Sequence, residues 1–257
     1  MLTGSKAPFS SGVLVALLSA GVLLFRLNSY RHPSSFISNP PAAGLPLNGL
    51  GLLFLACGVW GWARNPGPPG RVLLLYGAAM GVHWGGSIGA ESELAHIALL
   101  TLYAATTALG DGAFLDLALR LPKAVPRRGM VTLAPYSLAI LTLVSAPAVL
   151  FLPRRVLEAG LGAVFGMAFL MSIAAGVVFL VTWFRSNPSE RREHSLSSIA
   201  FALVASGVLD LLAEAAVLPG EPWNWKLAYG LVPVALARAI GGRGPVRGRS
   251  SRRSGSG

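Results

Sequence analysis

Charged residues are scarce in this chain. Only 12% of its 257 residues are Asp, Glu, Lys or Arg, whereas a soluble domain normally carries about 25%. Hydrophobic residues make up 53%, and the mean hydropathy is +0.62. So few charges cannot cover the surface of a soluble protein of this length. The composition therefore excludes an ordinary soluble domain and predicts that a lipid bilayer covers much of the surface.

Cysteine is almost absent, and so are the short motifs of common enzymes. Cys57 is the one cysteine and lies in an apolar stretch, which excludes an internal disulfide and a Cys-x-x-Cys metal site. We interpret it as a small buried apolar side chain. The sequence contains no His-Glu-x-x-His, no Gly-x-Ser-x-Gly and no phosphate-binding glycine loop. We therefore expect neither enzymatic activity nor a cofactor.

Acidic residues are few beside the basic ones, with 10 Asp and Glu against 21 Lys and Arg, for a net charge of +11. A nucleic-acid partner is excluded, because the basic residues lie in short loops and at the C-terminus and not on a stripe with interleaved aromatic residues. Orientation of membrane spans and contact with anionic lipid headgroups explain this placement better. The expected partners are the lipid bilayer and, for the C-terminal tail, anionic lipid.

Eight apolar segments have the length that a membrane-crossing helix needs, about 20 residues. Backbone groups inside lipid must be satisfied within the segment, so these segments are expected to be helices. The predicted fold is all-α, a polytopic membrane helix bundle that fills residues 1–240. We interpret the first apolar segment as a retained span, because no small-x-small cleavage site follows it. The expected spans are residues 11–27, 47–63, 72–89, 92–121, 130–152, 156–184, 194–218 and 223–240.

Most Lys and Arg residues fall on one side of the membrane in this topology. Because cytoplasmic loops carry the excess of positive charge, both termini are predicted to be cytoplasmic, in a multi-pass protein of the cell membrane. Arg154 and Arg155 go against this bias. Residues 241–257 contain one apolar side chain, Val246, and are predicted to form a disordered basic tail.

Short motifs in three places resemble the multi-span N-terminal sensor module of bacterial histidine kinases of the quorum-sensing and competence-regulating type. In that module a span ends in a Phe-Pro-like pair, a basic turn follows, and the next span opens near a Pro-Tyr-like pair. The matching motifs here are Phe114-Leu115, Leu119-Arg120-Leu121-Pro122, Arg127-Arg128 and Pro135-Tyr136, with Asn187 to Arg192 as the charged turn before the penultimate span and Tyr229 to Ile240 as the last span.

The resemblance implies a stand-alone sensory or signalling module of a bacterial inner membrane, which acts through a partner such as a kinase. It does not imply kinase activity, because few residues follow Ile240 and His194 lacks the acidic neighbour that usually follows a phospho-accepting histidine. The alternative is a small transporter or an ion- or proton-conducting protein. That alternative depends on Asp111, Asp116, Asp210 and Glu214, four carboxylates within the expected spans.

Ionisable side chains within a span cost about 2.5 to 3.5 kcal/mol each at the membrane centre, so each needs a partner or a role. Arg120 follows Asp116 by four residues, the favourable order for an ion pair within a helix. A second group is expected to meet near the outer face, with Asp210 as its central residue. The members of this group are Asp210, Glu214, His96, Glu93 and His83, with Glu91 close by.

Imidazoles and carboxylates in one place suit a hard metal ion, a cationic ligand or a pH sensor, and the sequence leaves the metal open. The structural alternative has Glu91 and Glu93 solvated in a loop, His83 capping an interface, and Asp210 bonded to a neighbouring Ser or Trp. Small residues also recur, as Gly77-x-x-x-Gly81 and Gly162-x-x-x-Gly166. This spacing allows close helix packing, either within the bundle or in a dimer interface.

Overall fold

The computed structural model describes residues 41–84, 92–121, 133–149, 151–215, 217–218 and 222–242. Every regular element in this part of the chain is a helix, so the all-α prediction is confirmed there. The expected first span, the basic loop with Arg127 and Arg128, Glu91 and the tail after Gly242 lie outside the described residues.

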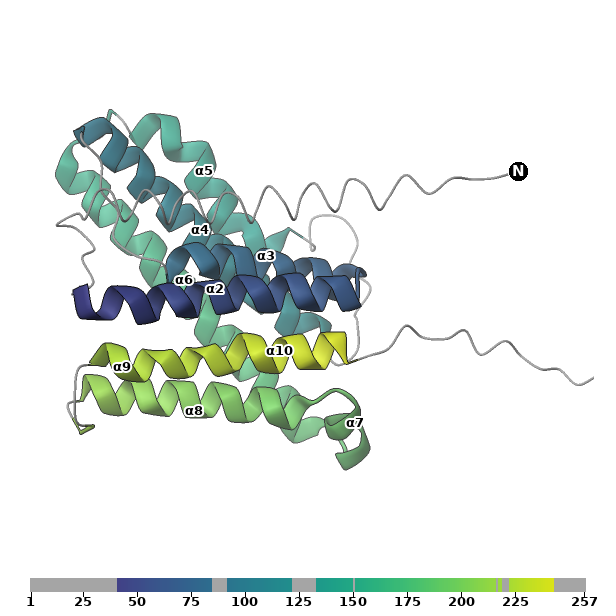
Figure 1. Cartoon of the computed structure of the whole chain (residues 1–257). Coiled ribbons are helices and arrows are strands. Elements are labelled where there is room, and N and C mark those ends of the chain that lie inside the picture. The colour runs from purple at the N-terminus through teal and green to yellow at the C-terminus, as the bar shows by residue number, and fades with distance from the viewer. Residues whose placement is uncertain are drawn as a thin grey trace, which may run out of the picture.

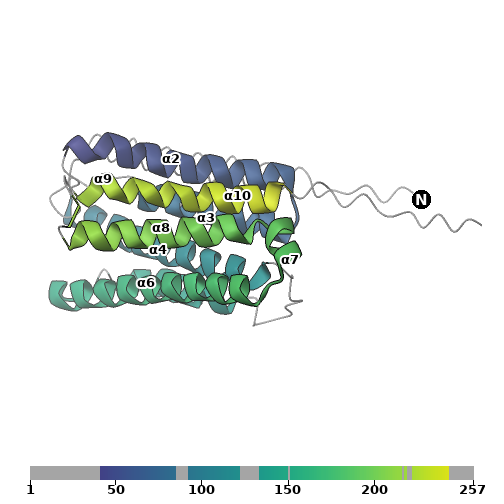
Figure 2. The same cartoon turned by 90° about the horizontal axis from the view of Figure 1, so that it is seen from below.

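The helices run up and down in an antiparallel bundle (Figures 1 and 2). At least one helical segment lies in each of the expected spans from the second to the eighth. The elements are α2 (Pro41–Arg64), α3 (Pro68–His83), α4 (Glu93–Arg120), η2 (Ala134–Tyr136), α5 (Ser137–Val149), α6 (Arg154–Arg185), α7 (Pro188–Glu193), α8 (Leu196–Glu214), α9 (Pro222–Lys226), η3 (Leu227–Gly230) and α10 (Leu231–Gly241).

Four of these helices are long and apolar enough to cross a membrane, namely α2, α4, α6 and α8. By contrast, α3 has 16 residues and α5 has 13, lengths that at 1.5 Å per residue fall short of a bilayer core about 30 Å thick. The structure is therefore that of a helical bundle with membrane-length apolar helices. The count of eight spans stays a prediction.

The most apolar of the four helices is also the most exposed. In α6 only 17% of the apolar window is buried, against 67% in α4, whose window is less apolar. Large side chains such as Phe169, Leu170 and Phe184 are more than 60% exposed along α6. A water-soluble bundle would bury its most apolar helix, so this inverted arrangement indicates that lipid covers the exposed face.

Local sequence signals set the helix ends. α4 starts at Ser92, whose hydroxyl oxygen accepts a hydrogen bond from the backbone N–H of Ala95 at 3.2 Å. α7 starts with a capping box between Asn187 and Glu190, with the side-chain oxygen of Asn187 accepting from the N–H of Glu190 at 2.9 Å. Such caps satisfy N–H groups that have no partner within the helix.

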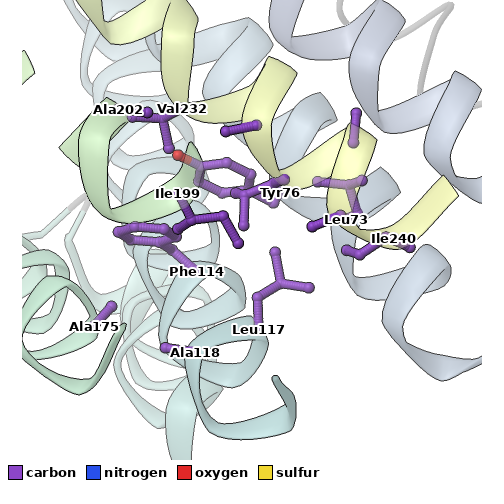
Figure 3. Packing of buried hydrophobic residues seen from close by; sticks show 14 of the residues in the cluster. Leu73, Tyr76, Phe114, Leu117, Ala118, Ala175, Ile199, Ala202, Val232 and Ile240 are labelled. Atoms are coloured by element: carbon purple, nitrogen blue, oxygen red, sulfur yellow. The ribbon is translucent and has the colours of Figure 1, made fainter. Parts of the chain in front are cut away.

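The centre of the bundle lies between α3, α4, α8 and α10 (Figure 3). Tyr76 stacks on Phe114 with ring centroids 5.3 Å apart, and Phe114 lies 5.5 Å from Phe179 of α6. Ile199 of α8 and Ile240 of α10 complete this apolar core. Since α4 packs on α3, α5 and α6 at once, it is the central helix that positions the buried polar groups.

The two glycine pairs have different surroundings. A Cβ atom on Gly77 would lie 2.4 Å from the carbonyl oxygen of Phe54 and 3.0 Å from Cα of Gly58, so α2 and α3 touch through their backbones there. Cβ atoms on Gly162 and Gly166 would meet no atom within 4 Å. Gly77 thus serves packing within the bundle, whereas Gly162 and Gly166 lie on the exposed face of α6.

The helix ends form two groups at opposite ends of the bundle (Figures 1 and 2). We call one of them the basic end, where α2, α4, α6 and α10 finish and α3 and α8 begin, and the other the Asp210 end. Arginine dominates the basic end, whereas the Asp210 end has Arg154, Arg155 and Lys226 among the described residues. The arginines of the basic end are Arg64, Arg71, Arg120, Arg185, Arg191, Arg192 and Arg238.

Candidate functional site

Asp116 is fully buried in α4 near the basic end, and both of its carboxylate oxygens are hydrogen-bonded. The Nε–H of Arg120 donates to its Oδ1 at 2.9 Å, and the hydroxyl of Tyr136 donates to its Oδ2 at 3.0 Å. The pair spaced at i, i+4 in the sequence is therefore an ion pair in the structure. Because Tyr136 belongs to η2, the same carboxylate also fixes the start of α5 against α4.

Asp111 lies five residues earlier on α4 and is also buried. Its carboxylate accepts a hydrogen bond from the hydroxyl of Ser172 on α6. The phenol of Tyr76 on α3 is close enough to interact electrostatically with it. Among the described residues no Lys or Arg pairs with Asp111, and its hydrogen-bond partner on α6 is the neutral hydroxyl of Ser172.

His83 at the end of α3 connects this helix to α4. Its Nδ1 lies 3.1 Å from Oγ1 of Thr107 and 3.3 Å from the hydroxyl of Tyr103, which also donates to the carbonyl oxygen of His83 at 3.1 Å. The rings of His83 and Tyr103 stack with centroids 5.6 Å apart. These contacts match the structural role considered for His83, a side chain that caps a helix interface.

Asp210 lies near the end of α8 and contacts Tyr229 of η3. The hydroxyl of Tyr229 donates to Oδ2 of Asp210 at 3.0 Å. The other oxygen, Oδ1, is buried and has no hydrogen-bond partner among the described residues. The sequence analysis named a Ser or a Trp as the structural partner, and the structure provides a Tyr.

Trp84 completes this group from the other side of Tyr229. The two rings lie 5.3 Å apart between centroids, and Trp84 also stacks on Phe54 of α2 at 6.4 Å. The Nε1–H of Trp84 is buried and, like Oδ1 of Asp210, has no partner in the described part of the chain. We call Trp84, Asp210 and Tyr229 the Asp210 cluster.

Glu214 forms an ion pair at the edge of this cluster. Nζ of Lys226 lies 3.2 Å from its Oε1, and the two side chains are 34% and 57% exposed respectively. The pair joins the end of α8 to α9. Lys226 falls within the expected span 223–240 and was not among the candidate site residues.

Glu93 and His96 begin α4 at a different place from the Asp210 cluster. α4 packs on α3, α5 and α6, whereas α8 packs on α6, α9, η3 and α10. Figure 1 shows the first turns of α4 beside α5 and α6, away from the last turns of α8. The expected meeting of Glu93 and His96 with Asp210 required α4 to pack on α8 at this end. The structure instead joins Asp210 to η3 and Glu214 to α9.

Within the described ranges, no group of three or more His, Cys, Asp or Glu side chains is placed to hold a metal ion. Asp111, Asp116, Asp210, Glu214 and His83 instead contact hydroxyl groups or basic residues. Sequence reasoning considered a Trp only as a hydrogen-bond partner of Asp210 and did not anticipate the ring contact between Trp84 and Tyr229. Their place at a span end was the available signal, because amphipathic Trp and Tyr side chains gather there.

Comparison with known proteins gives no assignment: no protein-family model, no curated protein and no solved structure matches this chain. The functional argument therefore depends on the chain's own residues.

Proposed function

We propose that this chain is a sensory or signalling module of a cell membrane, which acts through a partner protein such as a kinase and not by catalysis of its own. One observation carries the proposal. The Asp210 cluster includes Tyr229, and Tyr229 lies in η3, which continues directly into α10. A change in the bonding of Asp210 therefore acts on a helix that runs to the opposite end of the bundle.

α10 is well placed to carry such a change. Just before its start, in η3, the carbonyl oxygen of Ala228 accepts a hydrogen bond from the hydroxyl of Ser206 on α8 at 2.9 Å. At its end, Gly241 lies against the ring of Trp60, since a Cβ atom there would be 2.6 Å from that ring. Between these points its buried face packs on α2, α3 and α8. Because α10 contacts the bundle near both of its ends, a displacement at the Tyr229 end is transmitted along the helix to the Gly241 end.

The orientation belongs to the same proposal. Eight spans with both termini in the cytoplasm place the basic end at the cytoplasmic surface, in agreement with the arginines gathered there. The Asp210 end then faces the outside, where a stimulus arrives. The motifs around Phe114, Asn187 and Tyr229 that resemble a kinase sensor module support the same reading.

A small ion- or proton-conducting protein is the second candidate, and Asp111 is the observation in its favour. A buried carboxylate with no cation among the described residues is typical of proton relays in membranes. Asp116, the next carboxylate toward the basic end, is held in an ion pair by Arg120. A relay through both residues would have to break that pair, and we therefore favour the sensor.

A fluorescent reporter at the basic end tests the proposal in the full chain reconstituted in liposomes. Arg238 is exposed on α10 and takes the dye as R238C in a Cys57→Ala background. Tyr229→Phe removes the bond to Asp210 and is expected to shift the dye's emission. Tyr136→Phe removes the same kind of bond, hydroxyl to aspartate at 3.0 Å, and is expected to leave the emission unchanged because Tyr136 is not on α10.

Equal shifts from both variants, or from neither, contradict the transmission through α10. The same liposomes, loaded with a pH-sensitive dye, test the second candidate. The sensor predicts no proton uptake after an external pH step. Uptake that is lost in Asp111→Asn establishes the conducting protein and overturns the sensor.

A further inference from the structure

Asp210 differs from two other carboxylates of the bundle, Asp116 and Glu214, because no Lys or Arg among the described residues is paired with it. Asp116 faces Arg120 at 2.9 Å, and Glu214 faces Lys226 at 3.2 Å. Asp210 receives only the neutral hydroxyl of Tyr229, and its second oxygen is buried without a partner among the described residues. A carboxylate in such a setting calls for a cation from outside the described chain.

The neighbouring Trp84 lacks a hydrogen-bond acceptor within the described ranges, whereas Oδ1 of Asp210 lacks a donor there. Its buried indole N–H has no acceptor in the described part of the chain, and its ring lies against Tyr229. Buried polar groups are nearly always hydrogen-bonded in native proteins. An orphaned acceptor and an orphaned donor therefore flank one tyrosine, and Trp84, Asp210 and Tyr229 are each partly exposed. The two orphaned atoms are buried, whereas the residues that carry them reach the surface of the described bundle.

We propose that the Asp210 cluster binds a small organic ammonium ion that also carries an oxygen acceptor. The ammonium group donates to Oδ1 of Asp210 and lies against the faces of Trp84 and Tyr229, since aromatic faces attract cations. The oxygen of the ligand accepts from Nε1 of Trp84. Lys226 leaves Asp210 free for the ligand because Lys226 is paired with Glu214.

A metal ion fits the Asp210 cluster less well, and Asp111 is a less suitable site for the ammonium ion. A divalent metal ion needs several ligating side chains, and no such group is present among the described residues. Asp111 also lacks a cation, but it is only 6% exposed and bonds to Ser172, so a solute does not reach it. The proposal rests on the sensory function above, for which it names the chemical class of the stimulus.

Ethanolamine is the simplest probe of this class, and it has two natural sources, the free amine and the headgroup of a phospholipid. The full chain is placed in nanodiscs made of phosphatidylglycerol alone, and its melting temperature is measured with ethanolamine hydrochloride or with sodium chloride at equal ionic strength. The expected result is a higher melting temperature with ethanolamine, because a ligand that binds only the folded state stabilises it. Ethylene glycol, which has the oxygen but no charge, is expected to have no effect.

Variants locate the binding. Asp210→Asn is expected to weaken ethanolamine binding at least about tenfold, because the charge-assisted contact is lost. Trp84→Phe keeps an aromatic face, removes the N–H and is expected to weaken it less. Glu193→Gln removes a carboxylate at the basic end and is expected to bind like the wild type. The proposal is overturned if ethanolamine has no effect beyond that of sodium, or if Asp210→Asn keeps the full effect.

A second set of nanodiscs, containing phosphatidylethanolamine, distinguishes the sources. If the lipid headgroup occupies the site, these nanodiscs raise the melting temperature, free ethanolamine adds nothing, and Asp210→Asn abolishes the lipid's effect. Failure of the sensory function is seen separately, with the dye on R238C. Binding without a change in emission refutes signalling and leaves the site standing, whereas emission that responds to Tyr229→Phe without any ethanolamine binding refutes the site alone.

Discussion

The ion pair between Asp116 and Arg120 makes a sharp prediction about stability. Asp116→Asn leaves the Arg120 guanidinium beside a neutral amide, in a place where the arginine side chain is only 15% exposed. Breaking a buried ion pair by removal of one partner costs about 3 to 5 kcal/mol. We expect a loss of that size in the free energy of unfolding. Arg120→Gln is expected to cost at least as much, since it removes the guanidinium from the carboxylate of Asp116, which is fully buried.

Glu214 and Lys226 provide the matched control for this prediction. Their distance of 3.2 Å is close to that of the buried pair, but the two side chains are 57% and 34% exposed. Water screens such a pair, and exposed ion pairs contribute about 0 to 1 kcal/mol. Glu214→Gln is therefore expected to have several-fold less effect than Asp116→Asn, although the same kind of contact is removed.

The measurement is reversible unfolding of the full chain in mixed detergent micelles, with a double-mutant cycle. The variant with both Asp116→Asn and Arg120→Gln is expected to be more stable than the sum of the two single losses predicts, because no unpaired charge remains. Strict additivity of the two substitutions contradicts the reasoning. So does a loss for Asp116→Asn no larger than that for Glu214→Gln.

Three further predictions follow from the fold and the sequence. Gly77→Ala is expected to destabilise the protein by about 1 to 3 kcal/mol because the new Cβ atom would meet the backbone of α2. Gly162→Ala, whose Cβ atom would meet nothing within 4 Å, is expected to be neutral or to stabilise the protein by up to about 1 kcal/mol. Unfolding titrations of the two variants measure the difference. Reporter fusions after Asn65, Lys123 and Arg191 are expected to read cytoplasmic and one after Pro40 external, and an external reading at Lys123 would reverse the orientation. Deletion of residues 243–257 is expected to leave the melting temperature in detergent unchanged, and a large decrease would show that the tail packs on the helices.

Sequence reasoning worked best where composition decides the outcome. Scarce charge and long apolar segments predict membrane helices, and each expected span from the second to the eighth contains a helix. The boundaries differ where packing intervenes. α10 continues to Gly241, the first residue of the expected tail, because the absence of a side chain there lets the helix end lie against Trp60.

The spacing of residues within one helix was also informative. Arg120 follows Asp116 by one helical turn, so the pair can be predicted without knowledge of the fold. The contact of Asp210 with Tyr229 joins residues that are 19 positions apart, across the turn between α8 and η3. Hydrophobic periodicity gives no information on which helices become neighbours, so the expected meeting of His96 and Glu93 with Asp210 could not be derived from it.

Asp116 near the basic end and Asp210 at the other end differ in how completely their carboxylate oxygens are hydrogen-bonded, and this difference has a physical consequence. Near the basic end, Asp116 has both oxygens bonded, one to Arg120 and one to Tyr136. Complete pairing leaves nothing for a ligand to add and makes the contact a fixed point of the fold. Asp210 has one oxygen bonded and one orphaned, beside an indole N–H that is orphaned as well. A ligand that bonds to these two unpaired groups lowers the free energy of the folded state, whereas a fully paired group such as Asp116 gains nothing from a ligand. We therefore expect the response to a stimulus at the Asp210 cluster.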